Sequence, residues 1–128
     1  SAMPKAKIEF LQASWLDIDR ISDFYLREVG PVSAEKALAE IMEHIGILGE
    51  HPYAGTLHPD PVLAKQEYRK LVLTKTYIAV YRVIGDTVYI YRVVNGKTDY
   101  QEFSQGVIQS ESDFLMRLHE QEANYHGE

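Results

Sequence analysis

The sequence predicts an α+β fold, in which a small antiparallel sheet packs against an N-terminal helical hairpin and an extra helix follows near the C-terminus. Residues 67–100 are crowded with Tyr, Val and Ile, which are typical of strands. Residues 14–48 instead repeat apolar side chains at helical spacing, and residues 107–118 do so again. Strand and helix signals therefore occupy separate parts of the chain.

The chain begins with a short strand and a helix. Residues 5–11 alternate polar and apolar side chains, as a half-buried strand does. A helix is expected from Ser14, a favourable N-cap residue, to Val29, where a Gly-Pro pair ends it. We expect Asp17 to lie off the apolar stripe of this helix. The stripe is formed by Trp15, Ile18, Ile21, Tyr25 and Val29.

A second helix is expected from an N-cap at Ser33 to Gly49. Its apolar residues recur at i, i+3, i+4 and i+7: Ala37, Leu38, Ile41, Ile45 and Leu48. Residues 51–61 hold three prolines and one glycine, which indicates a loop. The two helices need an apolar surface to cover, and the following strands provide one.

Three consecutive antiparallel strands are expected at residues 68–73, 77–84 and 87–94, with Gly85-Asp86 as a two-residue hairpin loop. One side of the hairpin then carries the pairs Arg82–Tyr89, Val80–Tyr91 and Ile78–Val93, and the other Val83–Val88, Tyr81–Ile90 and Ala79–Arg92. The second side is more apolar near the loop, so we expect the helices to cover it and the first side to be open. A slip of one residue would exchange the sides.

The chain divides into one domain with short additions. Residues 1–4 look like a tag remnant and the N-terminus, residues 5–103 form the domain, and residues 104–128 are its C-terminal helical extension. The length suits a single core. There is no cysteine and no apolar run of about 20 residues that could span a membrane. We therefore expect a cytoplasmic protein.

The charge is unevenly distributed. The net charge is -6, which argues against direct DNA binding, yet residues 65–100 carry seven Lys or Arg against three Asp or Glu. Residues 101–128 carry one Arg and six acidic residues. The basic sheet could attract an acidic partner, or the acidic flanks could neutralise it within the same fold.

Several landmarks follow one another in a characteristic order. They are Trp15, Ile18 and Ile21 before Phe24-Tyr25; Ala37 and residues 41–48 leading to Pro52 and Gly55; Tyr68-Arg69-Lys70-Leu71; Tyr77 with Tyr81-Arg82-Val83; and Val88 to Val93. Together these landmarks resemble the RelE/ParE superfamily, the toxins of bacterial type II toxin–antitoxin systems, also called plasmid-stabilisation proteins. The likeness covers residues 5–103, and the acidic C-terminal extension goes beyond it.

The resemblance implies a toxin that is neutralised by a cognate antitoxin. RelE-like members cleave messenger RNA on the ribosome with Arg, Lys and a late Tyr or His. ParE-like members poison DNA gyrase and have no established catalytic set. In this chain the Arg position that opens the middle strand is Ile78, and Lys97 matches a later basic position without a guanidinium fork. The late Tyr matches Phe103, and Tyr100 would need a different register.

The nuclease set is thus incomplete, which favours the ParE-like branch and a protein that is not an enzyme. The alternatives are a RelE-like endoribonuclease acting on the ribosome and its mRNA, and a non-toxic relative in which the added acidic helix covers the sheet. Catalytic candidates for the nuclease alternative are Arg82, Lys97 and Tyr100. Residues expected to bind a target or an antitoxin are Arg69, Ile78, Val80, Arg82, Tyr89, Tyr91, Arg92 and Lys97.

Two of these residues have another interpretation. Arg69 and Arg92 could instead pair with Asp or Glu at the ends of the sheet. Arg82 is the stronger binding candidate, because Tyr89 opposite offers a ring for it to stack on. No metal or cofactor is expected, since the spacing of His44, His51 and His58 fits no zinc pattern.

Overall fold

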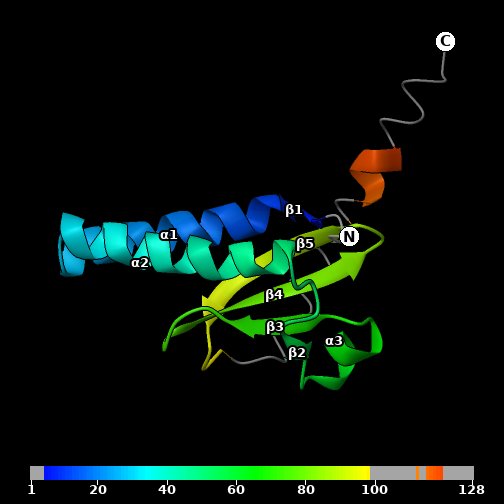
Figure 1. The fold of residues 1–128 in the computed structure, drawn as a ribbon. Helices are drawn as coiled ribbons and strands as arrows, with labels where there is room; N and C mark the ends of the chain where they lie inside the picture. The colour runs from blue at the N-terminus through cyan, green and yellow to red at the C-terminus, as the bar shows by residue number, and fades with distance from the viewer. Residues whose placement is uncertain (1–4, 99–111, 113–114, 120–128) are drawn as a thin grey trace, which may run out of the picture.

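The computed structural model describes residues 5–98, 112 and 115–119, and it has two layers (Figure 1). In chain order the elements are β1 (Lys7–Phe10), α1 (Gln12–Glu28), α2 (Pro31–Gly46), the 3₁₀ helix η1 (Ile47–Gly49), β2 (Thr56–Leu57), α3 (Pro61–Lys65), β3 (Arg69–Val72), β4 (Tyr77–Ile84) and β5 (Thr87–Asn95). The hairpin of α1 and α2 lies along one face of the sheet, and α3 lies on the other side of the molecule. The predicted α+β class and helical hairpin are confirmed.

The sheet has five strands in the order β1-β5-β4-β3-β2. The predicted antiparallel meander of β3, β4 and β5 is confirmed, and β2 is antiparallel to β3. Strand β1, however, lies parallel to β5, so the sheet is mixed. A parallel pair needs a long connection, and the helical hairpin together with β2 to β4 supplies it.

Helix α1 begins before the predicted cap. Leu11 is the N-cap residue, and the Ser14 hydroxyl donates a hydrogen bond to the Leu11 carbonyl oxygen at 2.7 Å from within the first turn. Trp15 and Val29 are 45% and 62% exposed, so they lie outside the buried stripe. That stripe instead includes Asp17, contrary to the prediction that Asp17 lies off it.

Helix α2 also begins earlier than predicted, at Pro31 rather than after Ser33. Gly30 has a φ of 133°, a region that favours glycine, and Pro31 takes the first helical position, where its missing N–H is not needed. The short connection returns α2 along α1. Ile41 and Ile45 are then buried against the sheet.

The predicted loop at residues 51–61 contains strand β2 and the start of α3. Asp60 caps α3, because its Oδ2 accepts a hydrogen bond from the Leu63 N–H at 3.1 Å. This short helix buries Leu63 completely. Composition alone indicated a loop, since proline and glycine dominate the segment.

Apolar cores lie on both faces of the sheet. The core under the helices comprises Ile18, Ile21, Ile41, Ile45, Leu48, Leu73, Ala79, Tyr81, Val88, Ile90 and Val93. The core on the opposite face comprises Leu11, Leu63, Tyr68, Ile78, Val80 and Tyr91. The helices therefore cover the side of the hairpin that was predicted to be covered. The other side, which was expected to be open, has an apolar core of its own.

A β-bulge divides the β4–β5 hairpin. Near the loop the predicted register holds, with Arg82 opposite Tyr89. Beyond the break between Val80 and Tyr81, β5 holds one extra residue, so that Val80 faces Arg92 rather than Tyr91. The other observed pairs past the bulge are Ala79–Val93, Ile78–Val94 and Tyr77–Asn95. The predicted pairs Val80–Tyr91, Ile78–Val93 and Ala79–Arg92 are therefore wrong. The bulge turns Val93 toward the helices.

Residues 112 and 115–119 are helical and lie within the C-terminal helix that the sequence predicts. The predicted segment 98–103, including Tyr100 and Phe103, lies outside the described residues beyond Thr98. None of the described helices combines the length and the apolar character needed to span a membrane.

Candidate functional site

The sheet face that carries Arg82 is only partly open. Leu63 and Tyr68 cover its middle and are themselves fully buried. Three residues of the predicted binding surface are buried in this second core: Ile78, Val80 and Tyr91. The expectation of an open face is wrong at these positions, because α3 and the start of β3 cover them. The accessible part of this face is therefore its rim and not its centre.

Arg82 lies at that rim, near the hairpin loop. Its guanidinium carbon is 5.1 Å from the centroid of the Tyr68 ring, and Tyr89 is its cross-strand neighbour. Tyr68 in turn packs edge-on against Tyr91, with ring centroids 4.9 Å apart. The predicted aromatic support for Arg82 is thus provided by Tyr68, which fixes the cation at the surface. Arg82 and Tyr89 are both half-buried.

Arg69 is held at the edge of the molecule by the backbone and an aromatic ring. It donates a hydrogen bond from Nη2 to the Gly55 carbonyl oxygen at 2.7 Å, and its guanidinium carbon lies 5.2 Å from the Tyr53 ring centroid. Tyr53 is 65% exposed. Arg69 therefore anchors the loop before β2, and Arg69 itself is half-buried.

Arg92 is half-buried and forms a bidentate ion pair with Asp17 of α1. Its Nε and Nη2 donate to the two carboxylate oxygens of Asp17 at 2.6 Å and 2.9 Å. The Val93 N–H donates to the same carboxylate at 3.0 Å. These hydrogen bonds raise the pKa of the Arg92 guanidinium. Of the two interpretations of Arg92, the structure supports the ion pair.

Lys97 lies at the opposite end of the β4–β5 hairpin from Arg82. Arg82 pairs near the loop, whereas Tyr77, five residues earlier on β4, pairs with Asn95 at the far end. Five residues of strand span roughly 17 Å. Lys97 instead shares a hollow of about 460 Å³ with Lys75 and Asn95. The structure does not bring Arg82 and Lys97 together.

Within residues 5–98, 112 and 115–119, no group of three or more His, Cys, Asp or Glu is placed to hold a metal ion. His58 is buried, and its Nδ1 accepts a hydrogen bond from the Asp60 N–H at 3.1 Å. Burial lowers the pKa of the His58 imidazole, while Asp60 opposes this and Lys70 reinforces it. His58 serves the fold of the β2–α3 connection.

Sequence reasoning missed the partner of Arg92 and the cover over the second core. A signal for Asp17 exists, since Ser14, Asp17, Ile18 and Ile21 follow helical spacing and make a buried stripe. The predicted stripe instead includes Trp15 and Val29, which are exposed, and this centres it away from Asp17. The cover by Leu63 has no comparable signal, because a five-residue helix is too short to show a period.

The chain was compared with known families and structures. The family model of the ParE toxin of the type II toxin–antitoxin system parDE matches residues 8–100. A solved structure of the chromosomal ParDE system from P. aeruginosa is 28% identical, with a TM-score of 0.61, over 74% of this chain and 98% of that chain. The RelBE2 toxin–antitoxin complex from Mycobacterium tuberculosis is similar in fold, with 20% identity and a TM-score of 0.54, over 75% of this chain and 97% of that chain. A search of curated proteins gave no match.

A helical hairpin on a small sheet with a C-terminal meander is the fold of the RelE/ParE superfamily, as these likenesses show. Because the family model matches well over half of the sequence, the chain belongs to the ParE toxin family of type II toxin–antitoxin systems. Residues 101–128 lie beyond the matched region.

Proposed function

We propose that this protein is the toxin of a type II toxin–antitoxin module and that it acts by binding DNA gyrase rather than by cutting RNA. A single observation carries this choice: the candidate cations Arg82 and Lys97 lie at opposite ends of the hairpin. RNA cleavage needs acid, base and phosphate-binding groups around one phosphate. Separated cations suit a protein-binding surface instead. The proposed target places its action in the cytoplasm.

The buried state of Ile78 supports the same choice. It is 5% exposed and occupies the position at which the nuclease branch carries an Arg. A methyl-terminated side chain in the second core can neither bind phosphate nor move a proton. The basic residues that line the same hollow as Ile78 are Lys75 and Lys97, and neither is an arginine.

The nuclease alternative keeps one observation in its favour. Lys75, Asn95 and Lys97 line a common hollow with Ile78, so two ammonium groups and an amide could hold phosphates there. Under this alternative, Tyr100 would have to complete the set. The proposed non-toxic relative differs from both, since it would bind neither gyrase nor ribosomes.

A cognate antitoxin is the second proposed partner. The similar solved structures are those of toxin–antitoxin systems, ParDE and RelBE2. Apolar side chains that could receive an amphipathic segment are exposed along the helical hairpin: Leu16, Phe24, Leu26, Val29 and Val32. We expect the antitoxin segment to lie across these helices and the sheet edge, as a helix in a groove or an added strand.

The experiment compares the two targets with the same purified protein. Under the proposal, the protein inhibits supercoiling by gyrase and traps gyrase–DNA cleavage complexes, and the antitoxin restores supercoiling. In a translation reaction, mRNA should stay intact. Codon-specific cuts in ribosome-bound mRNA together with unaffected gyrase would establish the nuclease alternative. Normal growth on expression of soluble, folded protein, with neither effect, would establish the non-toxic relative.

A further inference from the structure

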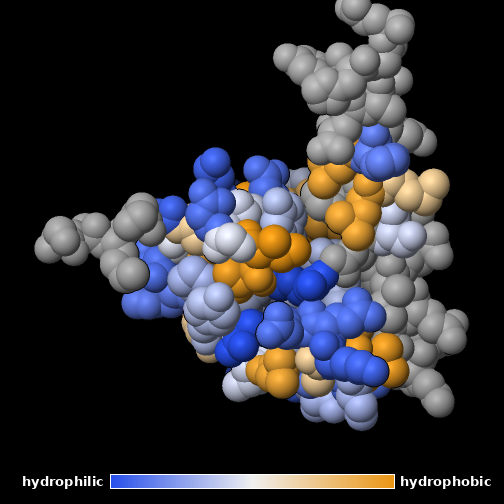
Figure 2. All heavy atoms as spheres, turned by 90° about the vertical axis from the view of Figure 1, so that its right-hand side faces the viewer, coloured by the Kyte–Doolittle hydropathy of each residue, from blue (hydrophilic) through white to orange (hydrophobic). Residues whose placement is uncertain are grey.

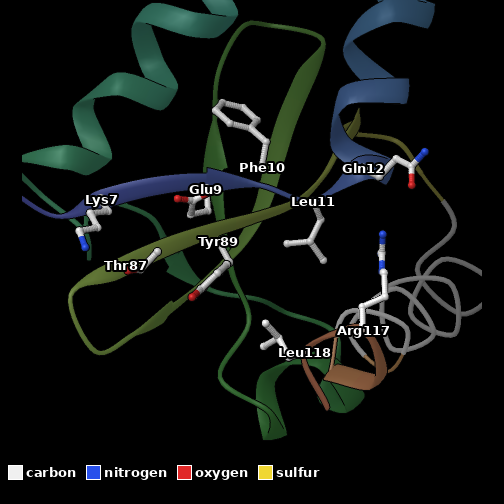
Figure 3. A pocket seen from close by; sticks show the side chains of 9 residues that line it. All are labelled: Lys7, Glu9, Phe10, Leu11, Gln12, Thr87, Tyr89, Arg117 and Leu118. Atoms are coloured by element: carbon white, nitrogen blue, oxygen red, sulfur yellow. The ribbon is translucent and has the colours of Figure 1, made fainter. Parts of the chain in front are cut away.

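A hollow of about 480 Å³ lies between the sheet and residues 115–119, which we name the C-terminal turn (Figure 3). Lys7 and Glu9 of β1 and Tyr89 of β5 line it from the sheet. Arg117 and Leu118 line it from the C-terminal turn. Strand β5 and the C-terminal turn are almost 30 residues apart in the sequence, and they therefore line the same hollow.

The C-terminal turn faces this hollow with a particular side chain. In Figure 3, Leu118 projects from the turn into the space below Leu11, and Tyr89 borders the same space. Leu118 is the least exposed large apolar residue of the turn, at 44%, compared with 53% for Leu115 and 60% for Met116. Figure 2 shows one of several apolar patches of this face close to the C-terminal turn. The side toward the sheet is thus the side already partly covered.

The hollow adjoins the residue on which target binding is proposed to depend. Tyr89 faces Glu9 on one side and Arg82 on the other, because β5 lies between β1 and β4. Tyr89 is half-buried and points to the same face as Arg82. A segment seated on Tyr89 therefore stands next to Arg82 and limits the approach of a large partner.

The whole C-terminal segment and the sheet region carry opposite net charges. Residues 101–128 contain six acidic residues and one Arg, whereas the sheet region 65–100 has an excess of basic residues. At the hollow itself both signs meet, because Lys7 and Glu9 of β1 and Arg117 of the turn line it. An acidic segment tethered to a basic face is held near it by long-range attraction, and apolar contact by Leu118 then fixes the position.

We propose that the C-terminal turn is the resident occupant of this surface, seated through Leu118 between Leu11 and Tyr89, and that gyrase has to displace it to reach Arg82. The effect on toxicity rests on the proposed function, whereas the docking itself does not. A competing occupant that covers the surface for about nine tenths of the time lowers the apparent affinity for a partner about tenfold. The segment that follows the family domain thus lowers the apparent affinity of that domain for gyrase.

The first experiment measures docking directly and uses the absence of cysteine from the chain. The double variant Glu9→Cys/Leu118→Cys is treated with a short bismaleimide in the full-length protein. We expect it to form an intramolecular cross-link much faster than the control Lys97→Cys/Leu118→Cys, because Lys97 lies at the far end of the hairpin. Equal rates for the two pairs would overturn the docking.

The second experiment measures the consequence. Leu118→Asp should release the turn and tighten gyrase binding by up to about tenfold. Met116→Asp is the matched control, because Met116 lies on the same turn, is exposed and lines a different hollow with Ser112 and His119. It should leave the affinity unchanged. Unaltered affinity of Leu118→Asp, or an equal gain in both variants, would overturn the shielding role.

The two proposals fail in distinguishable ways. If no form of the protein binds gyrase while the Glu9–Leu118 pair still cross-links rapidly, the gyrase assignment is wrong and the docking stands. If the wild type binds gyrase and the two cysteine pairs cross-link equally, the docking is wrong and the target assignment stands.

Discussion

The Asp17 carboxylate accepts hydrogen bonds from Nε and Nη2 of Arg92 at 2.6 Å and 2.9 Å, and so joins α1 to the bulged part of β5. Asp17 is 6% exposed, and the Arg92 side chain is 23% exposed. The same carboxylate also accepts the Val93 N–H at 3.0 Å. One side chain therefore satisfies a cation and a backbone donor at the point where the strand leaves its regular register.

We expect Asp17→Asn to lower the free energy of unfolding by about 3 kcal/mol, because it leaves the Arg92 charge without its counter-ion. Urea unfolding at neutral pH measures the loss. Asp19→Asn, an exposed position two residues along the same helix, is the control and should change stability by less than about 0.5 kcal/mol. Equal midpoints for the wild type and Asp17→Asn would show that the pair contributes nothing.

Gly55 occupies a position at which a side chain does not fit. A Cβ added there would lie 2.3 Å from the Lys70 carbonyl oxygen and 2.8 Å from the Tyr81 hydroxyl, which accepts the Gly55 N–H. Because one of these atoms belongs to the backbone, we expect Gly55→Ala to cost about 1–3 kcal/mol of stability.

Gly46→Ala is the matched control for this change. Gly46 ends α2 in a helical conformation, and an added Cβ meets nothing within 4 Å. We expect it to stabilise the protein by up to about 1 kcal/mol, since alanine favours the helix. Thermal unfolding of the two variants should move in opposite directions, and a loss of stability in both would contradict the steric account.

Whether the sequence predicts a given feature of this structure depends on how many neighbouring residues carry the signal for that feature. The hairpin loop at Gly85-Asp86 and the pair Arg82–Tyr89 are predictable, because turn chemistry fixes the register next to it. The bulge near Tyr91 is not predictable, because one extra residue does not interrupt an apolar stretch of sequence. Every pairing beyond it therefore shifts, and Val93 changes sides.

The candidate site was anticipated in part for a similar reason. Arg82 is at the surface beside an aromatic ring, as predicted, but the ring is Tyr68 from an adjoining strand segment. Tyr68 immediately precedes β3, the other strand that pairs with β4, so this support depends on the β3–β4 register, which no two-residue turn fixes. Likewise, the partner of Arg92 lies 75 residues away at Asp17, and no local pattern connects the two.

His58 should make stability depend on pH. Burial lowers the pKa of its imidazole, so the folded protein keeps His58 neutral while the unfolded chain binds a proton near pH 6.5. Stability is then fully present above about pH 6.5 and falls as the pH drops below that value. Urea midpoints measured from pH 7.5 downward should show this slope in the wild type.

The variant His58→Gln isolates the contribution, because it removes the titrating group whatever it does to absolute stability. We expect a flatter dependence on pH for His58→Gln, and an unchanged one for His51→Gln, whose side chain is exposed. An identical slope in His58→Gln and the wild type would assign the pH dependence to other groups.

Arg82 and Lys97 provide the test that separates a binding surface from a catalytic site. Because they lie at opposite ends of the β4–β5 hairpin, their contributions to gyrase binding should be independent. We expect Arg82→Ala to weaken gyrase inhibition about tenfold and Lys97→Ala about threefold, and the double variant to show the product of the two, within about twofold. Lys36→Ala, at an exposed position on α2, controls for the loss of a surface charge and should have little effect.

Groups that act as one catalytic unit behave differently, since removal of either one abolishes most of the activity and the second removal adds little. A double variant no weaker than Arg82→Ala, accompanied by loss of mRNA cleavage, would therefore move the assignment from gyrase to the ribosome.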